Sequence, residues 1–104
     1  MNKTKRRLSL SQSTVVEWLA ANTDRRLKHE FGEGTSLVFT HGPGVGHPKM
    51  TRATFDALVT RSVVVIDREY HHENVVGHAM PDGSMRWSGR TIRVYKLASP
   101  EGHQ

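Results

Sequence analysis

The chain has 104 residues, and 15 Lys and Arg stand against 10 Asp and Glu, which gives a formal net charge of +5 with histidine neutral. This length and a hydrophobic content of 36% allow one small globular domain. No apolar run approaches the ~20 residues of a membrane-spanning helix, which excludes an integral membrane protein. The absence of cysteine excludes a disulfide scaffold, a thiolate zinc site and a cysteine nucleophile. No apolar segment follows the first basic residues, so we expect no secretory signal and a cytoplasmic location.

Two blocks of positive charge account for most of the net charge. Residues 1–9 carry +4 and residues 83–100 carry another +4, whereas residues 67–82 carry −3. Blocks of one sign often mark contact with nucleic acid. We expect residues 10–98 to fold as one domain, between a disordered basic N-terminal arm at 1–9 and a flexible tail at 99–104.

A capping pattern marks the start of the first predicted helix. Ser9 is followed three residues later by Gln12, as in a capping box, and Ser11 is a competing N-cap. Apolar residues then recur at helical spacing, with Trp18 among them. We therefore predict a helix over residues 11–21 whose apolar stripe packs in the core.

The next segment is predicted to form a short second helix, then a strand and a loop. Good N-cap residues at positions 23 and 24 predict a helix that ends at Lys28 or Phe31. Residues 36–40 are rich in strand formers. Residues 41–48 contain three glycines and two prolines, which indicates a loop.

The clearest element is a helix predicted over residues 52–60. Thr51 is a suitable N-cap, and three apolar residues follow at helical spacing. The helix runs directly into four β-branched residues at 63–66. Such a run predicts a buried strand.

Two more strands are predicted in the last third of the chain. They cover residues 74–80 and 85–97, and we expect the second to be interrupted near Ser88 and Gly89. Proline and glycine between the two strands predict a tight turn at residues 80–84.

The order of these elements resembles that of winged helix-turn-helix proteins. Ala57-Leu58-Val59-Thr60-Arg61-Ser62 resembles the "ALxxRG" stretch that closes the family's recognition helix, with serine where the family usually has glycine. Arg93-Val94-Tyr95-Lys96-Leu97 resembles the "RxYxL" strand that ends its wing. The resemblance covers residues 11–97 in the order of elements, but only 51–66 and 93–97 in pattern. It implies an α+β fold, a small winged-helix-like domain with two to three helices packed on a β-hairpin or a three-stranded antiparallel sheet.

The resemblance also implies a transcriptional regulator that binds double-stranded DNA. A recognition helix presents its N-terminal residues to bases and phosphates in the major groove, while a basic wing follows the backbone. The DNA-binding residues implied in this way are Lys49, Thr51, Arg52, Thr54, Arg86, Arg90 and Arg93. Basic arms add minor-groove contacts in other proteins, and the arm residues here are Lys3, Lys5, Arg6 and Arg7. Because many such proteins dimerise, a homodimer is a further expectation.

The seven histidines raise a metal-dependent enzyme as a third hypothesis. His71, His72 and His78 lie close in the sequence among glutamates, and imidazole and carboxylate ligands suit zinc or a similar ion. On a strand, however, His71 and His72 face opposite sides, and the segment has no HExxH motif. We therefore assign no metal, no cofactor and no catalytic residue from the sequence.

The second hypothesis is a protein-binding adaptor or inhibitor without catalytic activity. Nothing in the sequence argues for a reaction, and small basic proteins without catalytic motifs often act by binding a larger complex. In this interpretation the acidic segment 67–82, with its histidines, is the contact surface.

Overall fold

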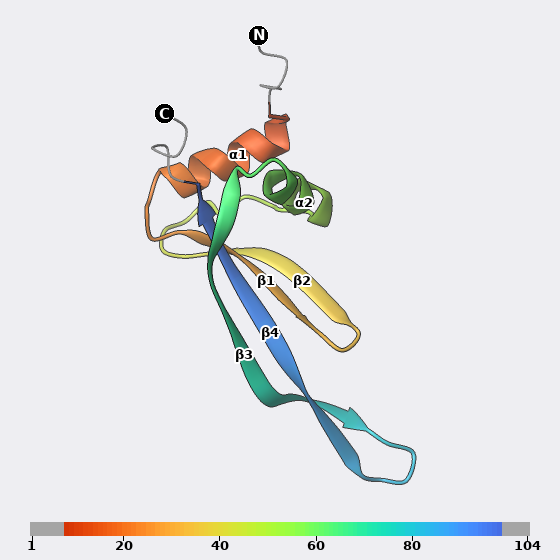
Figure 1. Cartoon of the computed structure of the whole chain (residues 1–104). Coiled ribbons are helices and arrows are strands. Elements are labelled where there is room, and N and C mark those ends of the chain that lie inside the picture. The colour runs from red at the N-terminus through yellow and green to blue at the C-terminus, as the bar shows by residue number, and fades with distance from the viewer. Residues whose placement is uncertain (1–7, 99–104) are drawn as a thin grey trace.

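The computed structural model of the protein describes residues 8–98 (Figure 1). Two helices and four strands follow one another along the chain. They are α1 (Leu10–Ala20), β1 (Arg26–Gly32), β2 (Thr35–His41), α2 (Arg52–Thr60), β3 (Val64–Ala79) and β4 (Met85–Leu97).

The capping box predicted for α1 is confirmed. The Ser9 hydroxyl accepts a hydrogen bond from the Gln12 backbone N–H at 3.2 Å, and the Gln12 side-chain oxygen accepts one from the Ser9 N–H at 3.3 Å. Two N–H groups that lack a partner within the helix are thereby satisfied. Val15, Trp18 and Leu19 are buried, so the predicted apolar stripe does face the core.

The short helix predicted after residue 23 is wrong, because Arg26–Gly32 forms strand β1. Side chains in this segment alternate, with Leu27 and Phe31 on one face and charged residues between them. Both neighbouring strands hydrogen-bond to β1, since β2 and β4 pair with it on either side. Non-local pairing therefore overrides the local capping signal.

The helix predicted at 52–60 is confirmed, and so is its cap. The Thr51 hydroxyl accepts from the Thr54 N–H at 3.1 Å. At the other end, the N–H of Val63 donates to the carbonyl of Leu58 and that of Ser62 to the carbonyl of Val59, both at 3.0 Å. This is a Schellman motif, and Ser62 holds its left-handed position with φ of 59°.

The last two strands form one long hairpin, and the predicted interruption is wrong. β3 continues without a break from the apolar run at 64–66 through the histidine-rich segment, and β4 is continuous through Ser88 and Gly89. The β3–β4 pairing has two register shifts, between Ile66 and Arg68 and between His72 and Val76, and the second lies opposite Gly89. The turn at residues 80–84 is confirmed by hydrogen bonds between Met80 and Ser84 and between Gly83 and Met80.

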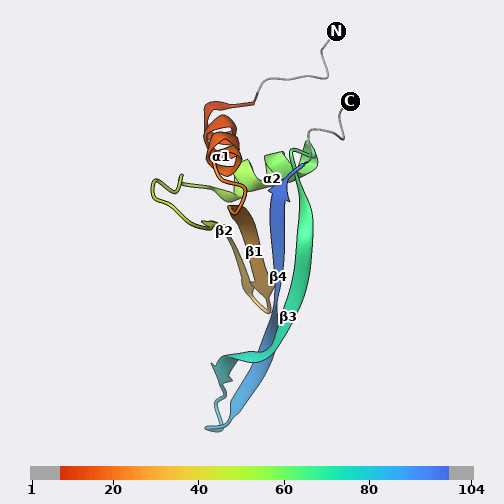
Figure 2. The same cartoon turned by 90° about the vertical axis from the view of Figure 1, so that its left-hand side faces the viewer.

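The sheet is entirely antiparallel, with the strand order β2-β1-β4-β3. Both helices lie at one end of it, and the β3–β4 hairpin extends away from them (Figures 1 and 2). The core combines Val15, Trp18 and Leu19 of α1 and Phe55 and Leu58 of α2 with apolar residues of the sheet. Leu27 and Tyr95, which pair across β1 and β4, belong to this core, so we name their side of the sheet the helix face.

This architecture shows that the predicted winged-helix-like fold is wrong. In the described residues 8–98, α2 is preceded by strand β2 and a loop, so no helix-turn-helix unit forms. Four strands rather than a hairpin or three strands make up the sheet. The residues of β1 are the ones that the winged-helix interpretation needed as a helix.

The described part of the chain is elongated, with extents of 62 × 29 × 24 Å. Its length comes from residues 73–89, the end of the β3–β4 hairpin that lies beyond the paired region of β1; we name this segment the distal hairpin (Figure 2). Glu33, in the turn between β1 and β2, binds Arg86 of the distal hairpin through both carboxylate oxygens, at 2.9 and 2.7 Å.

Candidate nucleic-acid interface

The residues predicted to contact DNA at the start of α2 have structural partners. Thr51 caps the helix, and Thr54 is buried and hydrogen-bonded to it. Arg52 donates to Asp56 at 3.0 Å and to the Ser36 hydroxyl at 2.7 Å. Lys49 is exposed in the segment before the helix. At the N-terminal end of α2, the charge of Arg52 is therefore paired with Asp56, whereas Lys49 is an exposed cation.

The three arginines predicted to form a basic wing are each paired with a glutamate. Arg86 binds Glu33, Arg90 binds Glu30 at 3.1 Å, and Arg93 binds Glu69 at 2.7 Å. Arg86 lies on the distal hairpin, and Arg90 lies on the face of the sheet away from the helices. Arg93 lies on the helix face, where it stacks over Phe31. The structure does not bring the predicted DNA-binding residues together in one basic surface. The predicted arm residues Lys3, Lys5, Arg6 and Arg7 lie outside the described residues.

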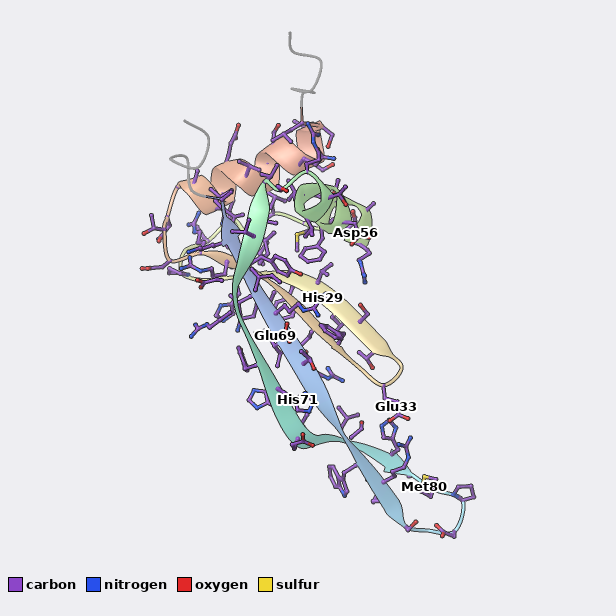
Figure 3. The ribbon with its side chains drawn as sticks, in the orientation of Figure 1. His29, Glu33, Asp56, Glu69, His71 and Met80 are labelled. Atoms are coloured by element: carbon purple, nitrogen blue, oxygen red, sulfur yellow. The ribbon has the colours of Figure 1, made fainter. Side chains whose placement is uncertain are left out.

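The three histidines considered as metal ligands are also kept apart. His71 contacts Glu73 at 3.0 Å and Thr91, His72 packs edge-on against Tyr70, and His78 contacts Ser88 on the distal hairpin. Figure 3 shows His71 and Glu69 along β3 and Met80 near the far end of the hairpin. Between residues 8 and 98, no three His, Asp or Glu side chains are grouped so that they could hold a metal ion.

A different surface brings basic and aromatic side chains together. Because successive side chains of a strand alternate, the residues that pair in register with Lys28 and Glu30 share the face of the sheet opposite the helices, which we name the open face. Its members are Arg26, Lys28 and Glu30 of β1, Leu37, Phe39 and His41 of β2, Val65, Arg68, Tyr70 and His72 of β3, and Arg90, Ile92, Val94 and Lys96 of β4.

Positive charge dominates the open face. Five basic side chains stand against two carboxylates, Glu30 on the face and Asp67 at the first register shift, which leaves +3. Asp67 binds Arg26 at 3.2 Å and Lys96 at 3.6 Å. The hydrogen bond from Arg26 is the largest of the effects that lower the pKa of Asp67. Within the described part of the chain, Lys28 and Arg68 form no ion pair with a carboxylate, so their charge is available to a ligand.

One row of the open face shows how charge and ring surfaces are interleaved. Phe39, Lys28, Val94 and Arg68 follow one another across the four strands in register. Val94 is buried, with 1% of its surface exposed. Phe39 is half-buried, so part of its ring remains accessible.

The neighbouring row adds a second aromatic residue and an aliphatic floor. Leu37, Glu30, Ile92 and Tyr70 follow one another across the sheet. Ile92 is buried, Tyr70 is half-buried and Leu37 is 51% exposed. At the helix end of the face, partial burial, followed by the charge of Lys28 and of His47, lowers the pKa of His41. His41 therefore adds little charge at neutral pH.

A recess lies on the open face where the sheet meets the distal hairpin. It has a volume of about 390 Å³ and is lined by Glu30, His72, Val75, Val76, Arg90 and Ile92. The Glu30–Arg90 ion pair forms its polar side, with side chains 28% and 20% exposed respectively. Glu30 was not among the residues predicted from the sequence, and Arg90 was assigned to the wing. The pair could not be predicted because the two residues are 60 positions apart and meet only through β1–β4 pairing.

Comparison of the chain with protein-family models, curated proteins and solved structures gives no match. No helix among residues 8–98 has both the length and the apolar character needed to cross a membrane. The function is therefore inferred from the geometry of the described residues.

Proposed function

We propose that the protein binds single-stranded nucleic acid on the open face of its sheet. The observation that carries the proposal is the register row Phe39, Lys28, Val94 and Arg68, in which two unpaired cations and an aromatic ring share one face. Cations that track the phosphates, together with ring surfaces on which bases stack, are the two elements of single-strand binding.

Stacking on Phe39 and Tyr70 requires unpaired bases, because the bases of a duplex stack on one another. Four-stranded antiparallel sheets bind single strands in this way in other proteins. The double-stranded DNA interface implied by the sequence needs Arg52 and the wing arginines instead, and these are paired with carboxylates. The geometry thus favours single strands over duplexes.

Titration of fluorescent twelve-nucleotide oligomers at several salt concentrations tests the proposal. We expect DNA or RNA single strands to bind more tightly than a duplex of the same sequence, with affinity falling steeply as salt rises. Lys28→Gln and Arg68→Gln are each expected to reduce the slope of log K against log salt by about 0.7. The matched control is Lys49→Gln, which removes the same charge from an exposed position away from the open face.

Two results would overturn the proposal. One is the absence of binding to any single strand at low salt. The other is an equal loss of slope in Lys49→Gln and in Lys28→Gln, which would show that net charge alone attracts the ligand. Tighter binding of the duplex than of the single strands would instead favour double-stranded DNA as the ligand.

Protein binding is the second candidate function, and two exposed apolar side chains of the distal hairpin favour it. Met85 and Trp87 are 51% and 53% exposed, and their side chains lie over Gly77 on the paired strand. Exposed large apolar groups on a projecting element often mark a protein contact. The partner that fits is an apolar groove on a larger protein.

A photo-cross-linking residue at position 85 tests this candidate, with position 60 on α2 as the control. Protein binding predicts that one nuclease-insensitive partner is cross-linked from position 85 only. The purified partner should then bind the parent chain and lose affinity for Trp87→Ser. Equal cross-linking from both positions would contradict it.

A further inference from the structure

We infer that the recess between the sheet and the distal hairpin is a binding site for one unstacked guanine base. The inference rests on the proposed function and names a base that the same face selects. It starts from the Glu30–Arg90 pair and from the apolar walls around it.

The polar side of the recess offers hydrogen-bond groups in a fixed order. Arg90 Nη1 donates to one oxygen of Glu30 at 3.1 Å. A carboxylate has about four acceptor positions and a guanidinium five donors, so both groups retain capacity. The pair presents one donor group beside two acceptor oxygens.

This order matches the Watson–Crick edge of guanine, which carries an acceptor, O6, beside two donors, N1–H and the exocyclic amine. O6 accepts from Arg90, while the two donors reach the oxygens of Glu30. Adenine and cytosine each place a ring-nitrogen lone pair next to a single donor, so that lone pair meets the carboxylate. Uracil and thymine have one donor between two carbonyls. Only guanine satisfies both oxygens of Glu30, and such reading of the base edges is typical of single-strand recognition.

The rest of the recess suits the faces of a base. Val75, Val76 and Ile92 provide apolar walls, and the ring of His72 lines the recess as well. Its volume of about 390 Å³ lies within the range of small-ligand pockets, about 300–1,000 Å³. The second register shift of β3, between His72 and Val76, places these side chains at the recess.

Nine-nucleotide thymidine oligomers that differ only in the central base test the inference. The central base is guanine, adenine, hypoxanthine or thymine, and affinities are measured at one low salt concentration. We expect guanine to bind about tenfold more tightly than adenine. Hypoxanthine, which lacks the exocyclic amine, should lose most of that preference, because one hydrogen bond to a charged group is then missing.

Glu30→Gln is the matching protein variant. An amide presents a donor to the guanine donors, so we expect the guanine preference to disappear while the all-thymidine oligomer still binds. Glu69→Gln is the control, since Glu69 also pairs with an arginine of β4 but lies on the helix face, away from the recess. The hypoxanthine comparison uses the unaltered chain and does not depend on the folding of any variant.

The outcomes separate this inference from the proposed function. Equal binding of guanine and adenine oligomers, or a preference that survives Glu30→Gln, overturns the guanine site and leaves single-strand binding in place. Failure of every oligomer to bind, all-thymidine included, overturns both.

Discussion

Ser62 is the described non-glycine residue with a positive φ, at 59°, and it ends α2. The Schellman hydrogen bonds from Ser62 and Val63 fix this conformation. A β-carbon in the left-handed region costs about 1–2 kcal/mol, which glycine avoids. The sequence alone showed serine at a position where a helix-ending glycine is common. Only the backbone shows that Ser62 adopts the left-handed conformation that glycine would adopt there.

Ser62→Gly is therefore expected to stabilise the protein. We predict a rise of about 1 kcal/mol in the free energy of unfolding, somewhat offset by the extra entropy of glycine in the unfolded chain. Urea denaturation followed by circular dichroism measures the change. Ser62→Ala keeps the β-carbon and should show no such gain. A loss of stability in Ser62→Gly would contradict the assignment.

His29 gives a residue-level prediction about pH. Partial burial is the largest cause of its lowered pKa, and the charges of Arg52 and Arg93 add to it, while Asp56 acts in the opposite direction. The folded pKa thus lies below the unfolded value of 6.5, so the unfolded chain takes up the proton first as the pH falls. The stability contribution is present above pH 6.5 and is lost below it.

Thermal unfolding between pH 7.5 and 5.5 tests this prediction. We expect the midpoint of the parent chain to fall on acidification, and His29→Gln to show a shallower fall. The other histidines are present in both proteins, so the difference between the two curves isolates His29. Identical slopes would show that burial of this imidazole does not affect stability.

At the scale of elements, local signals predicted the two helices and the turn at residues 80–84, whereas non-local pairing decided β1. Cap residues at 23 and 24 favoured a helix, although the alternation of Leu27, His29 and Phe31 with charged residues was visible in the sequence. Strand β3 was likewise underestimated, because its polar half is held by β4 rather than by its own propensity. The Thr51 and Ser9 caps needed only neighbours within three residues, which is why they could be predicted.

Glu33 connects the distal hairpin to the rest of the sheet, and we expect this contact to hold the orientation of the hairpin. An isolated two-stranded hairpin is marginal in water, and the bonds from Arg86 to Glu33 connect this one to the turn between β1 and β2. Figure 3 shows Glu33 at that turn. The hydrogen bond from Arg86 is the main cause of the lowered pKa of the Glu33 carboxyl, so the pair persists at neutral pH.

Glu33→Gln is expected to make the distal hairpin more mobile without unfolding the sheet. The {¹H}–¹⁵N NOE of the Trp87 amide should fall, while that of the Val94 amide in the sheet should not change. Glu69→Gln removes a carboxylate partner from Arg93 instead and should leave the Trp87 value unchanged. An unaltered NOE in Glu33→Gln would show that the hairpin is rigid without this contact.

At the scale of the whole molecule, the net charge of +5 is distributed differently from what the sequence blocks indicated. The basic block at 83–100 is largely neutralised, because Arg86, Arg90 and Arg93 each find a glutamate from another part of the chain. On the open face, the cations that form no ion pair with a described carboxylate are Lys28 and Arg68, which are 40 positions apart and lie in one row only because both pair in register with Val94. No local pattern predicts this surface, since it requires the order of all four strands.

The most direct test of the open face is methyl NMR during titration with a single-stranded oligomer. Methyl groups report on one face of a sheet, unlike backbone amides. We predict that the signals of Leu37, Ile92 and Val94 shift on binding, while those of Val15 and Leu58 in the core under the helices do not. Shifts centred on α2 and the core, with the open-face methyls unchanged, would contradict it.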